Sequence, residues 1–469
     1  MSHDVITRFA PSPTGHLHLG GARTALFNWL YAKHNNGKFL LRIEDTDKKR
    51  SSQELIDSII NAMSWLKIHY DGKAVLQSEN ISRHVEIANQ LMLNNKAYYC
   101  YCSEEEINKE KEESAKKGLY YKHNCIWKNK SAPNSNITRV VRLKSPTDGV
   151  TSFDDEVYGN ITVNNSQLDD MILLRSDNTP TYLLSVVVDD HDMNISHIIR
   201  GTDHLTNTAR QLLIYNALEW DPPKFAHIPL IHDENGNKLS KRHQAIGIHE
   251  YKNSGILPEA IFNYLLRMGW SHENDEVITI DQAIRWFSIE GIGHSPSRLD
   301  SKKLEFLNNH YINITNNETI LNMIIPIIEE KTGHIITDVK KGYLLKGLSE
   351  LKKRTKNLVN LAKESLFYVE DIPISIDQES ITVIKDYKHI FSILYDNLSK
   401  ISEKDWNHNI LMSIIKDISC NLEVKISIVY HCLRASITGR MNAPSIIEIM
   451  INLQHKECLQ RIKYALDVI

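Results

Sequence analysis

The chain has 469 residues, of which 42% are hydrophobic and 24% are charged, a composition typical of folded globular domains and unlike that of disordered or collagen-like chains. A chain of this length is expected to form roughly two to four domains. Its formal net charge of −3 provides no overall attraction to nucleic acid, so any RNA contact must depend on local basic surface.

Neither membrane association nor secretion is expected. No apolar run reaches membrane-spanning length, and residues 1–4 lack the basic flank and apolar core of a signal peptide. The six cysteines do not form a dense disulfide framework, so we expect reduced thiols. These features predict a cytoplasmic protein without a membrane partner.

A strand, a glycine-bearing turn and a helix open the chain. Residues 5–9 form an apolar strand-like run, and residues 22–33 follow the helical period. Free N–H groups at a helix start favour a polyphosphate, and Gly20 in the turn lets such a ligand approach the main chain. The turn contains neither a P-loop nor a G-x-G-x-x-G pattern, so a different nucleotide-binding fold is predicted.

The alternation of strand and helix continues with a strand at 38–43 and a helix at 55–66, which favours a doubly wound sheet. From about residue 95 the pattern changes to cysteines, a highly charged helix and a polar stretch. Strand signals return at 138–143 and 171–175. We therefore expect an insertion that splits the nucleotide-binding domain.

Cysteines in this inserted segment form a candidate metal site. Cys100 and Cys102 are followed by Cys125, and three thiolates suit zinc, with a histidine or a phenolate as the fourth ligand. A C-x-C pair is less specific than paired C-x-x-C motifs. The residues alone therefore leave a zinc site and structural thiols both open.

A lysine-rich motif at 238–242 follows an apolar run and an Asn-Gly turn signal. Lys238 and Lys241 are expected on a loop, where their charges would neutralise a departing pyrophosphate. The remainder of the chain is increasingly helical. Its clearest basic segment, residues 340–356, is by itself typical of a solvated helix face.

Taken together, these motifs resemble a known family. The segments that carry the resemblance to bacterial-type glutamyl-tRNA synthetases of class I are residues 8–15, 18–28, 41–47, 188–191, 199–201, 238–242 and 433–439. The resemblance runs to the end of the chain.

The resemblance implies an α/β Rossmann-type catalytic domain with an α+β insertion, followed by an all-α anticodon-binding region. The implied parts are 1–94 and 186–240 for the two halves of the catalytic domain, 95–185 for the inserted acceptor-end-binding domain, 241–315 for the lysine-motif loop and helical stem-contact region, and 316–469 for the helical anticodon-binding domain. In that architecture Lys352, Lys353, Arg354 and Lys356 become candidates for phosphate contacts.

The implied reaction is the ATP-dependent ligation of L-glutamate to the 3′ end of its tRNA through a glutamyl-adenylate, with ATP and Mg²⁺ as substrate and with AMP and pyrophosphate released. The resemblance implies catalytic roles for His18, Lys238 and Lys241, and ATP binding by His16, His18, Gly20 and Lys241. Because a carboxylate is already nucleophilic, the first step needs alignment and charge stabilisation more than a strong base.

An acidic amino acid presents two carboxylates and one ammonium, so its pocket should combine arginines with a carboxylate. The resemblance implies that glutamate is bound by Arg8, Ser12, Glu44, Tyr182, Arg200 and the neighbouring His204, with Glu44 on the ammonium group.

The family also implies tRNA(Glu) as partner, leaves tRNA(Gln) open, and suggests a monomer. Some members carry structural zinc in the insertion, which implies the ligand set Cys100, Cys102, Tyr121 and Cys125. Because Trp127 stands where a histidine can follow the last cysteine, either Tyr121 or His123 must supply the fourth ligand.

Other functions remain alternatives. A nucleotidylyltransferase would not need the long helical C-terminal region, and a non-catalytic RNA-binding relative should have lost His18 or Lys241. A glutaminyl-tRNA synthetase is disfavoured by residues 8–15 and by the helical C-terminal pattern. A tRNA-modifying paralogue lacks the anticodon-binding part.

Overall fold

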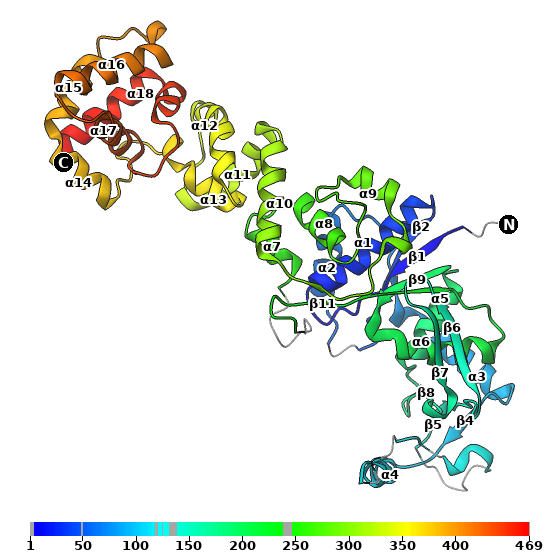
Figure 1. The fold of residues 1–469 in the computed structure, drawn as a ribbon. Coiled ribbons are helices and arrows are strands. Elements are labelled where there is room, and N and C mark those ends of the chain that lie inside the picture. The colour runs from blue at the N-terminus through cyan, green and yellow to red at the C-terminus, as the bar shows by residue number, and fades with distance from the viewer. Residues whose placement is uncertain are drawn as a thin grey trace. The chain divides into compact units, whose positions relative to one another are not determined.

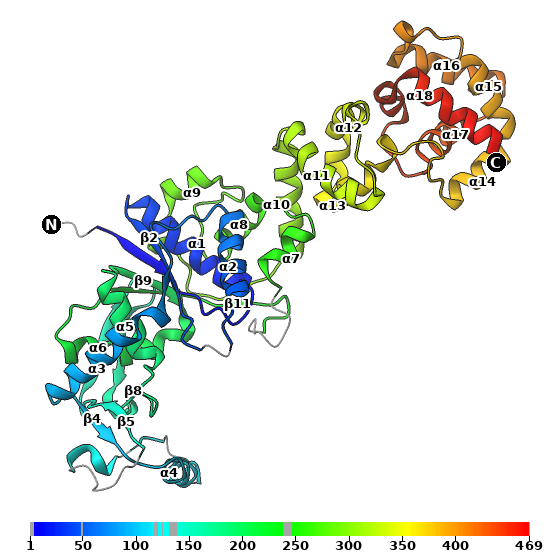
Figure 2. The same ribbon diagram turned by 180° about the vertical axis from the view of Figure 1, so that it is seen from behind.

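A computed structural model describes residues 4–47, 50–116, 118, 121–123, 125–130, 138–237 and 246–468. The chain forms two compact units (Figures 1 and 2). The first unit comprises Met1–Tyr251 and Ile261–Ser301, and the second comprises Lys252–Ala260 and Lys302–Ile469.

The first unit is organised around parallel strands. Two of its described sheets have the strand orders β1-β2-β3 and β7-β6-β10-β9, and within these two sheets only β7 runs antiparallel to its neighbour. Ser196 N donates to Ile6 O at 2.9 Å and so joins the start of β9 to β1. The strands are β1 (Ile6–Phe9), β2 (Lys38–Ile43), β3 (Val75–Leu76), β6 (Val150–Asp155), β7 (Gly159–Asn164), β9 (His197–Gly201) and β10 (Lys224–Ile228).

Helices connect these strands, because parallel neighbours require long crossover connections. They are α1 (Leu19–His34), α2 (Gln53–Trp65), α3 (Ile81–Leu93), α5 (Tyr182–Asp192) and α6 (Leu205–Leu218). Helix α1 packs against β1, β2 and β9, and its Ala22, Ala25, Leu26 and Leu30 are fully buried. The predicted doubly wound arrangement is thus present.

The inserted segment contains a separate antiparallel sheet in the order β4-β5-β8. Its elements are β4 (Ala97–Cys100), α4 (Glu104–Lys116), β5 (Val140–Leu143) and β8 (Ile172–Leu174). One apolar core joins this sheet to α3, α5 and α6. Strands β6 and β7 also lie within residues 95–185, but they extend the sheet of β9 and β10.

Further short elements follow the sheet that contains β9 and β10. They are β11 (Ile231–His232), α7 (Ile248–Asn253), α8 (Pro258–Arg267), α9 (Ile280–Trp286) and β12 (Ser297–Arg298). Helix α9 begins with a capping box in which Thr279 and Gln282 satisfy each other's backbone N–H groups. None of the described helices is long and apolar enough to cross a bilayer.

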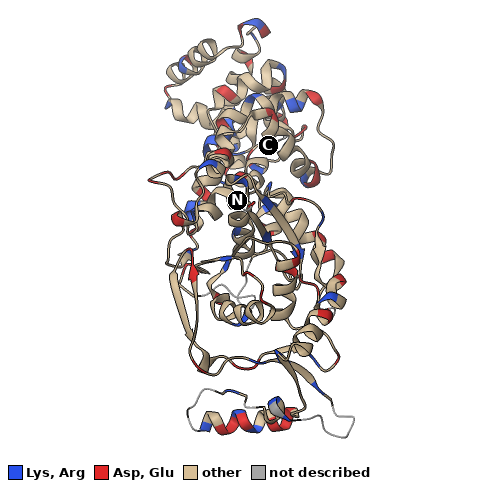
Figure 3. Cartoon of the chain, turned by 90° about the vertical axis from the view of Figure 1, so that its right-hand side faces the viewer, with Lys and Arg blue, Asp and Glu red and all other residues tan. Residues whose placement is uncertain are grey.

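The described part of the second unit is helical, as predicted. Its helices are α10 (Ser301–Ile314), α11 (Asn317–Thr332), α12 (Asp338–Leu351), α13 (Leu358–Glu364), α14 (Gln378–Asp386), α15 (Lys388–Leu398), α16 (His408–Asn421), α17 (Ile426–Thr438) and α18 (Ile446–Val468). Helix α18 is kinked at Gln454, which has φ 68°. Figure 3 shows acidic and basic residues intermixed along these helices.

The basic segment after α12 has mixed roles. Lys352 is buried and donates to Thr315 O and to Asn317 Oδ1, and burial lowers its pKa. It therefore holds the helices together and is a poor candidate for a phosphate contact. Its neighbours are more exposed and pair with nearby side chains: Lys353 with Glu350, Arg354 with Asn442, and Lys356 with Glu305.

Candidate functional site

A cavity of about 410 Å³, here called the first cavity, opens where β1, β2 and β9 end. The carboxyl ends of parallel strands are the usual ligand-binding edge of such sheets. The predicted residues that line it are Arg8, Ser12, His16, His18, Gly20, Glu44, Tyr182, Arg200 and His204. The structure therefore brings together every predicted ATP-binding or glutamate-binding residue that it describes.

His18 caps the N-terminus of α1. Its Nδ1 accepts the backbone N–H of Gly21 at 3.2 Å, so the ring proton sits on Nε2. A Cβ on Gly20 would lie 3.2 Å from this ring, so glycine keeps the turn open beside the cap. His16 lies beside the same turn, with its Nδ1 2.7 Å from Ser58 Oγ. The turn thus presents helix N–H groups and imidazoles to one cavity.

The predicted Lys238 and Lys241 lie outside the described residues. The described chain beyond them returns to the histidine turn: Ile248 N donates to Leu17 O at 2.8 Å, and Gly247 forms an antiparallel bridge with His18. On the N-terminal side of the two lysines, Ile231 of β11 lines the first cavity.

A buried ion-pair cluster underlies the cavity. Asp190 of α5 accepts two hydrogen bonds from Arg8, at 3.0 and 3.2 Å, and one from Arg42 at 2.6 Å. Burial alone would raise the pKa of Asp190, but the two guanidinium groups lower it. A bidentate pair of this kind fixes the plane of the Arg8 guanidinium. Arg8 therefore enters the cavity already oriented and neutralised.

Glu44 follows β2 and faces the same cavity. Its backbone N–H donates to Pro11 O at 2.9 Å, and its carboxylate lies 3.6 Å from Arg42. Burial raises the pKa of Glu44 to about 7, although Arg42 and Arg8 act in the opposite direction. The carboxylate is thus under-compensated by the protein, which suits a group that awaits a cationic partner.

Tyr182 and His204 form a neutral hydrogen-bonded pair on one wall. The Tyr182 hydroxyl lies 3.1 Å from His204 Nδ1. Burial raises the pKa of Tyr182 to about 12, and burial together with nearby Arg200 lowers that of His204 to about 4. Both side chains are therefore neutral near pH 7 and act through hydrogen bonds.

Arg200, at the end of β9, supplies a second cation. Its Nε donates to His227 at 3.2 Å, and one terminal nitrogen donates to Thr208 and Gln211 at 2.6 and 2.8 Å. The other terminal nitrogen is buried and lacks a hydrogen-bond partner within the described chain. An anion in the cavity would satisfy it.

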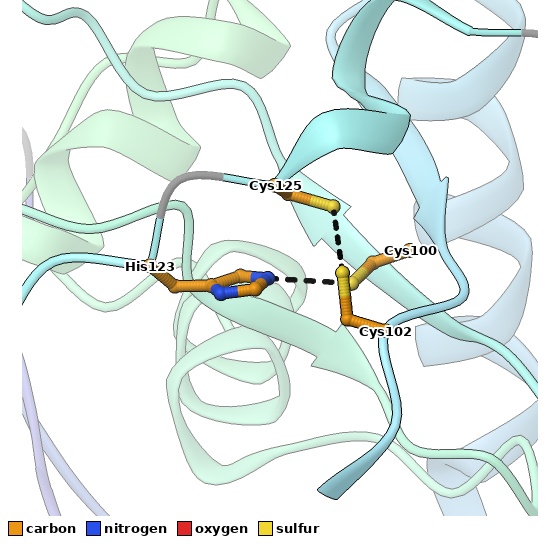
Figure 4. Close-up of side chains that lie close together, drawn as sticks. All are labelled: Cys100, Cys102, His123 and Cys125. Atoms are coloured by element: carbon orange, nitrogen blue, oxygen red, sulfur yellow. Dashed lines mark hydrogen bonds between the residues drawn. The ribbon is translucent and has the colours of Figure 1, made fainter. Parts of the chain in front are cut away.

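The inserted segment brings four candidate metal ligands to one centre. Figure 4 shows Cys100, Cys102, His123 and Cys125 pointing toward one another, and their ligand atoms all lie within 4.8 Å of each other. Cys102 and Cys125 have their sulfurs 3.7 Å apart, and Cys100 Sγ lies 3.6 Å from His123 Nε2. A tetrahedral zinc would place two sulfurs about 3.8 Å apart, and a sulfur and an imidazole nitrogen about 3.6 Å apart.

Between the two residues that the sequence left open as fourth ligand, the geometry favours His123. The Tyr121 hydroxyl lies 3.2 Å from His123 Nδ1 and also donates to Glu110, while Glu110 lies 3.0 Å from the same ring nitrogen. A carboxylate on the outer nitrogen of a metal-binding histidine is a common supporting contact. Tyr121 is therefore placed behind His123, outside the cluster of ligand atoms.

A second cavity, of about 570 Å³, lies between the insertion and α5. Arg142, Arg175, Arg210 and Lys111 line it, and Tyr182 lines both cavities. Arg142 and Arg175 are held by the carbonyls of Asp170 and Pro180. This cavity thus combines cationic groups with a side chain, Tyr182, that also lines the first cavity.

Residues 4–306, more than half of the chain, match the family described as tRNA synthetases class I (E and Q), catalytic domain. The chain belongs to this family. Residues 319–466 match an anticodon binding domain.

Relatives of this class I synthetase match its sequence over nearly the full length of both chains. A glutamate–tRNA ligase 2 of Ehrlichia chaffeensis is 83% identical, with 100% of each chain covered. A glutamate–tRNA ligase 1 of Wolbachia pipientis is 53% identical, with 98% of this chain and 99% of the relative covered. A crystal structure of a glutamate tRNA ligase from Elizabethkingia meningosepticum in complex with its amino acid has a TM-score of 0.87 at 28% identity, over 99% of this chain and 100% of that one.

Some residues that shape this synthetase's cavity were missed in the sequence. Asp190 was part of the segment at residues 188–191 but had no predicted role, and no role was predicted for Asp155 or His227. Asp190 lies 182 positions from the Arg8 that it orients. Only the alternation of strands that places β1 beside α5 and β9 could have pointed to this pairing.

Proposed function

We propose that this class I synthetase ligates L-glutamate to the 3′ end of tRNA through a glutamyl-adenylate, with release of AMP and pyrophosphate. The observation that carries the proposal is the first cavity, in which Arg200 has an unpartnered guanidinium nitrogen and Glu44 an under-compensated carboxylate, both beside the helix start at His18. A molecule with a carboxylate at one end and an ammonium at the other fits those charges. The names of the full-length relatives support the same substrate.

In the first step, the protein aligns the α-carboxylate of glutamate with the α-phosphate of ATP, which is used with Mg²⁺. The N–H groups at the start of α1 and the imidazole of His18 would hold phosphate oxygens. Ser12, His16 and Gly20 share that cavity. No strong base is required, because the attacking carboxylate is already ionised.

Lys238 and Lys241 are proposed to stabilise the departing pyrophosphate. The support is the described chain on either side of them: β11 precedes them at the rim of the first cavity, and Gly247 follows them in a bridge with His18. Lysines between two described segments that both lie at this rim are close in sequence to it, and their charges suit the negative charge that develops on phosphate oxygens. Lys241→Ala is expected to reduce glutamate-dependent pyrophosphate exchange severely and to leave the fold intact.

In the second step, a ribose hydroxyl of the tRNA accepts the glutamyl group. The second cavity is proposed to receive the unpaired 3′ end, because Arg142, Arg175 and Arg210 suit phosphates and because Tyr182 joins this cavity to the first. The second unit is proposed to read the anticodon, in keeping with its match to an anticodon binding domain. The five-part division at residues 94, 185, 240 and 315 remains our proposal for the domain roles.

Zinc is proposed at the cluster of Cys100, Cys102, His123 and Cys125. The support is the chemistry of the donor set, since three thiols and an imidazole suit zinc, and the ligand spacing described above. Burial alone would raise the pKa of the Cys100 thiol, but hydrogen bonds from His123, from the backbone of Cys102 and from Cys125 lower it to about 6. When bound, the ion would supply structural cross-linking of β4 to the segment at residues 121–130.

A charging assay with radiolabelled glutamate tests the function. We expect charging of tRNA(Glu), strictly dependent on ATP, and little charging with labelled glutamine. Separate transcripts of tRNA(Glu) and tRNA(Gln) show whether the second is also a substrate. A protein that transfers AMP from ATP to an acceptor other than glutamate, and that charges neither tRNA, would instead be a nucleotidylyltransferase.

We also propose that the synthetase acts as a cytoplasmic monomer. The support is that tRNA, ATP and glutamate, the proposed substrates, meet in the cytoplasm, and that the family resemblance implies a monomer. Light scattering coupled to gel filtration would give one chain mass of 54.0 kDa for a monomer, and twice that mass for a dimer.

A further inference from the structure

Arg200 differs from Arg8, another cation of the first cavity, in its partners. Arg8 is neutralised by a bidentate bond to Asp190. Over the described residues, Arg200 instead donates only to a histidine ring, a hydroxyl and an amide oxygen. A buried cation without a counter-charge is costly, so the fold must hold Arg200 in place by other means.

His227 is the acceptor for the Nε–H of Arg200. Its Nε2 lies 3.2 Å from Arg200 Nε, and its Nδ1 lies 2.6 Å from Asp155 Oδ2. Because arginine only donates, Nε2 must carry a lone pair, and the ring proton must sit on Nδ1. Burial lowers the pKa of His227, which keeps the ring neutral.

Asp155 fixes that tautomer through its contact with Nδ1, the ring nitrogen that does not face Arg200. Its Oδ1 accepts the backbone N–H groups of Val157 and Tyr158 at 3.1 and 2.9 Å. Its Oδ2 faces the imidazole and also accepts the backbone N–H of His227 at 3.1 Å. The residue is 3% exposed at the end of β6. A carboxylate held by so many donors accepts only, so the ring must present N–H to it.

We infer that Asp155 and His227 are positioning residues for glutamate recognition: they fix the imidazole tautomer that orients Arg200, and they leave one guanidinium nitrogen free for the side-chain carboxylate of glutamate. This inference rests on the proposed function. Neither residue is among the described lining of the first cavity, so both act through Arg200. Glutamine, whose carboxamide brings no negative charge, would leave the buried cation uncompensated and would be rejected.

Asp155→Asn is the primary perturbation. The backbone N–H groups of Val157 and Tyr158 require an oxygen facing them, so the new NH₂ group would face His227. The ring must then accept at Nδ1 and carry its proton on Nε2, where it meets the Nε–H of Arg200, donor against donor. We expect the KM for glutamate to rise at least about tenfold, with little change in the KM for ATP.

A second substitution separates positioning from general damage. His227→Gln keeps an amide oxygen near the place of Nε2 but has no tautomers, so it should stay within about threefold of the wild-type KM for glutamate. In that background, adding Asp155→Asn should cost little, whereas a purely structural role for Asp155 predicts the same loss in both backgrounds. His227→Leu, which removes the acceptor, should resemble Asp155→Asn.

The matched control is Asn263→Asp, an isosteric change at a buried residue that bonds the backbone of Glu276 and Ile278 and is not among the described lining of the first cavity. It should lower thermal stability without changing the KM for glutamate.

Three results overturn the inference. The first is an unchanged KM for glutamate in Asp155→Asn, and the second is an equal rise in this KM when Asp155→Asn is added to wild type and to His227→Gln. The third is a competitive inhibition constant for glutamine that rises in Asp155→Asn in parallel with the KM for glutamate. If Asp155→Asn does not fold, the inference requires His227→Leu to have at least about ten times the KM of His227→Gln, and equal values refute it. Failure of the wild-type protein to charge tRNA with glutamate would instead refute the proposed function.

Discussion

Glutamate binding should depend on pH through Glu44. Its pKa is raised to about 7 because burial outweighs the attraction of Arg42 and Arg8, and only the ionised carboxylate can pair with the substrate ammonium. With a pKa near 7, about 9% of the groups are ionised at about pH 6 and about 91% at about pH 8. The KM for glutamate should therefore be about tenfold higher at the lower pH, and substrate binding should release a proton.

The same shift affects stability, with a definite sign. A carboxyl whose folded pKa exceeds its unfolded value of 4.5 stabilises the free protein fully below that value and loses this contribution as the pH rises through about 7. The loss amounts to at most about 3 kcal/mol. Glu44→Gln should remove it, so the variant should be more stable than wild type at about pH 8, yet bind glutamate more weakly.

The assay measures the KM for glutamate at several pH values with saturating ATP and tRNA, for wild type and Glu44→Gln. Glutarate, which has both carboxylates and no ammonium, is the control ligand: its inhibition should not improve as Glu44 ionises. A wild-type KM that is flat between about pH 6 and pH 8, or a Glu44→Gln variant with the wild-type pH dependence, would refute this reasoning.

Further predictions concern the cap, the metal cluster and the helical unit. His18→Ala should lose both adenylate formation and about 1 kcal/mol of helix capping, whereas His18→Asn should restore much of the stability, measured by denaturant unfolding, but not the activity. Cys125→Ser should lose stoichiometric zinc in metal analysis, whereas the exposed Cys420→Ser should retain it. Lys352→Met should destabilise the protein by about 1–3 kcal/mol, because it removes the charged donor from two partly buried acceptors, and Lys353→Met should leave stability nearly unchanged. Equal effects of the two lysine changes on unfolding would contradict the structural role of Lys352.

The turn from Gly15 to Gly21 could be predicted from the sequence because the residues that form this part of the site lie next to one another in the chain. A strand end, a capping histidine and a helix start follow one another within a few residues, and their chemistry depends on that order. The strands at 140–143 and 172–174 were visible for the same reason, since alternation and apolar composition are local properties. Local signals thus predicted the sheet and one wall of the cavity.

Pairings between distant residues could not be read in this way. His227 and Asp155 are 72 positions apart, and no spacing rule connects a strand end to a residue on another strand. For Lys352 the sequence predicts the wrong environment. A lysine in a basic run is expected to be exposed to solvent, whereas Lys352 is buried and donates to Thr315 and Asn317. Burial decides which charges serve the fold and which remain available, and burial is a property of the assembled chain.

The charges of the first cavity divide into two groups with different consequences. Arg8 and Arg42 share the carboxylate of Asp190, and Arg42 also pairs with Asp189 at 3.7 Å, so this group is rigid and fixed before any ligand arrives. Glu44 and Arg200 are less well compensated: the pKa of Glu44 stays raised although Arg42 lies 3.6 Å away, and Arg200 has no carboxylate partner among the described side chains. A ligand that carries both an ammonium and a carboxylate relieves both costs at once, while a ligand with only one of them leaves a buried charge unpaired. Selectivity for an acidic amino acid therefore follows from what the fold leaves unpaired as much as from what it provides.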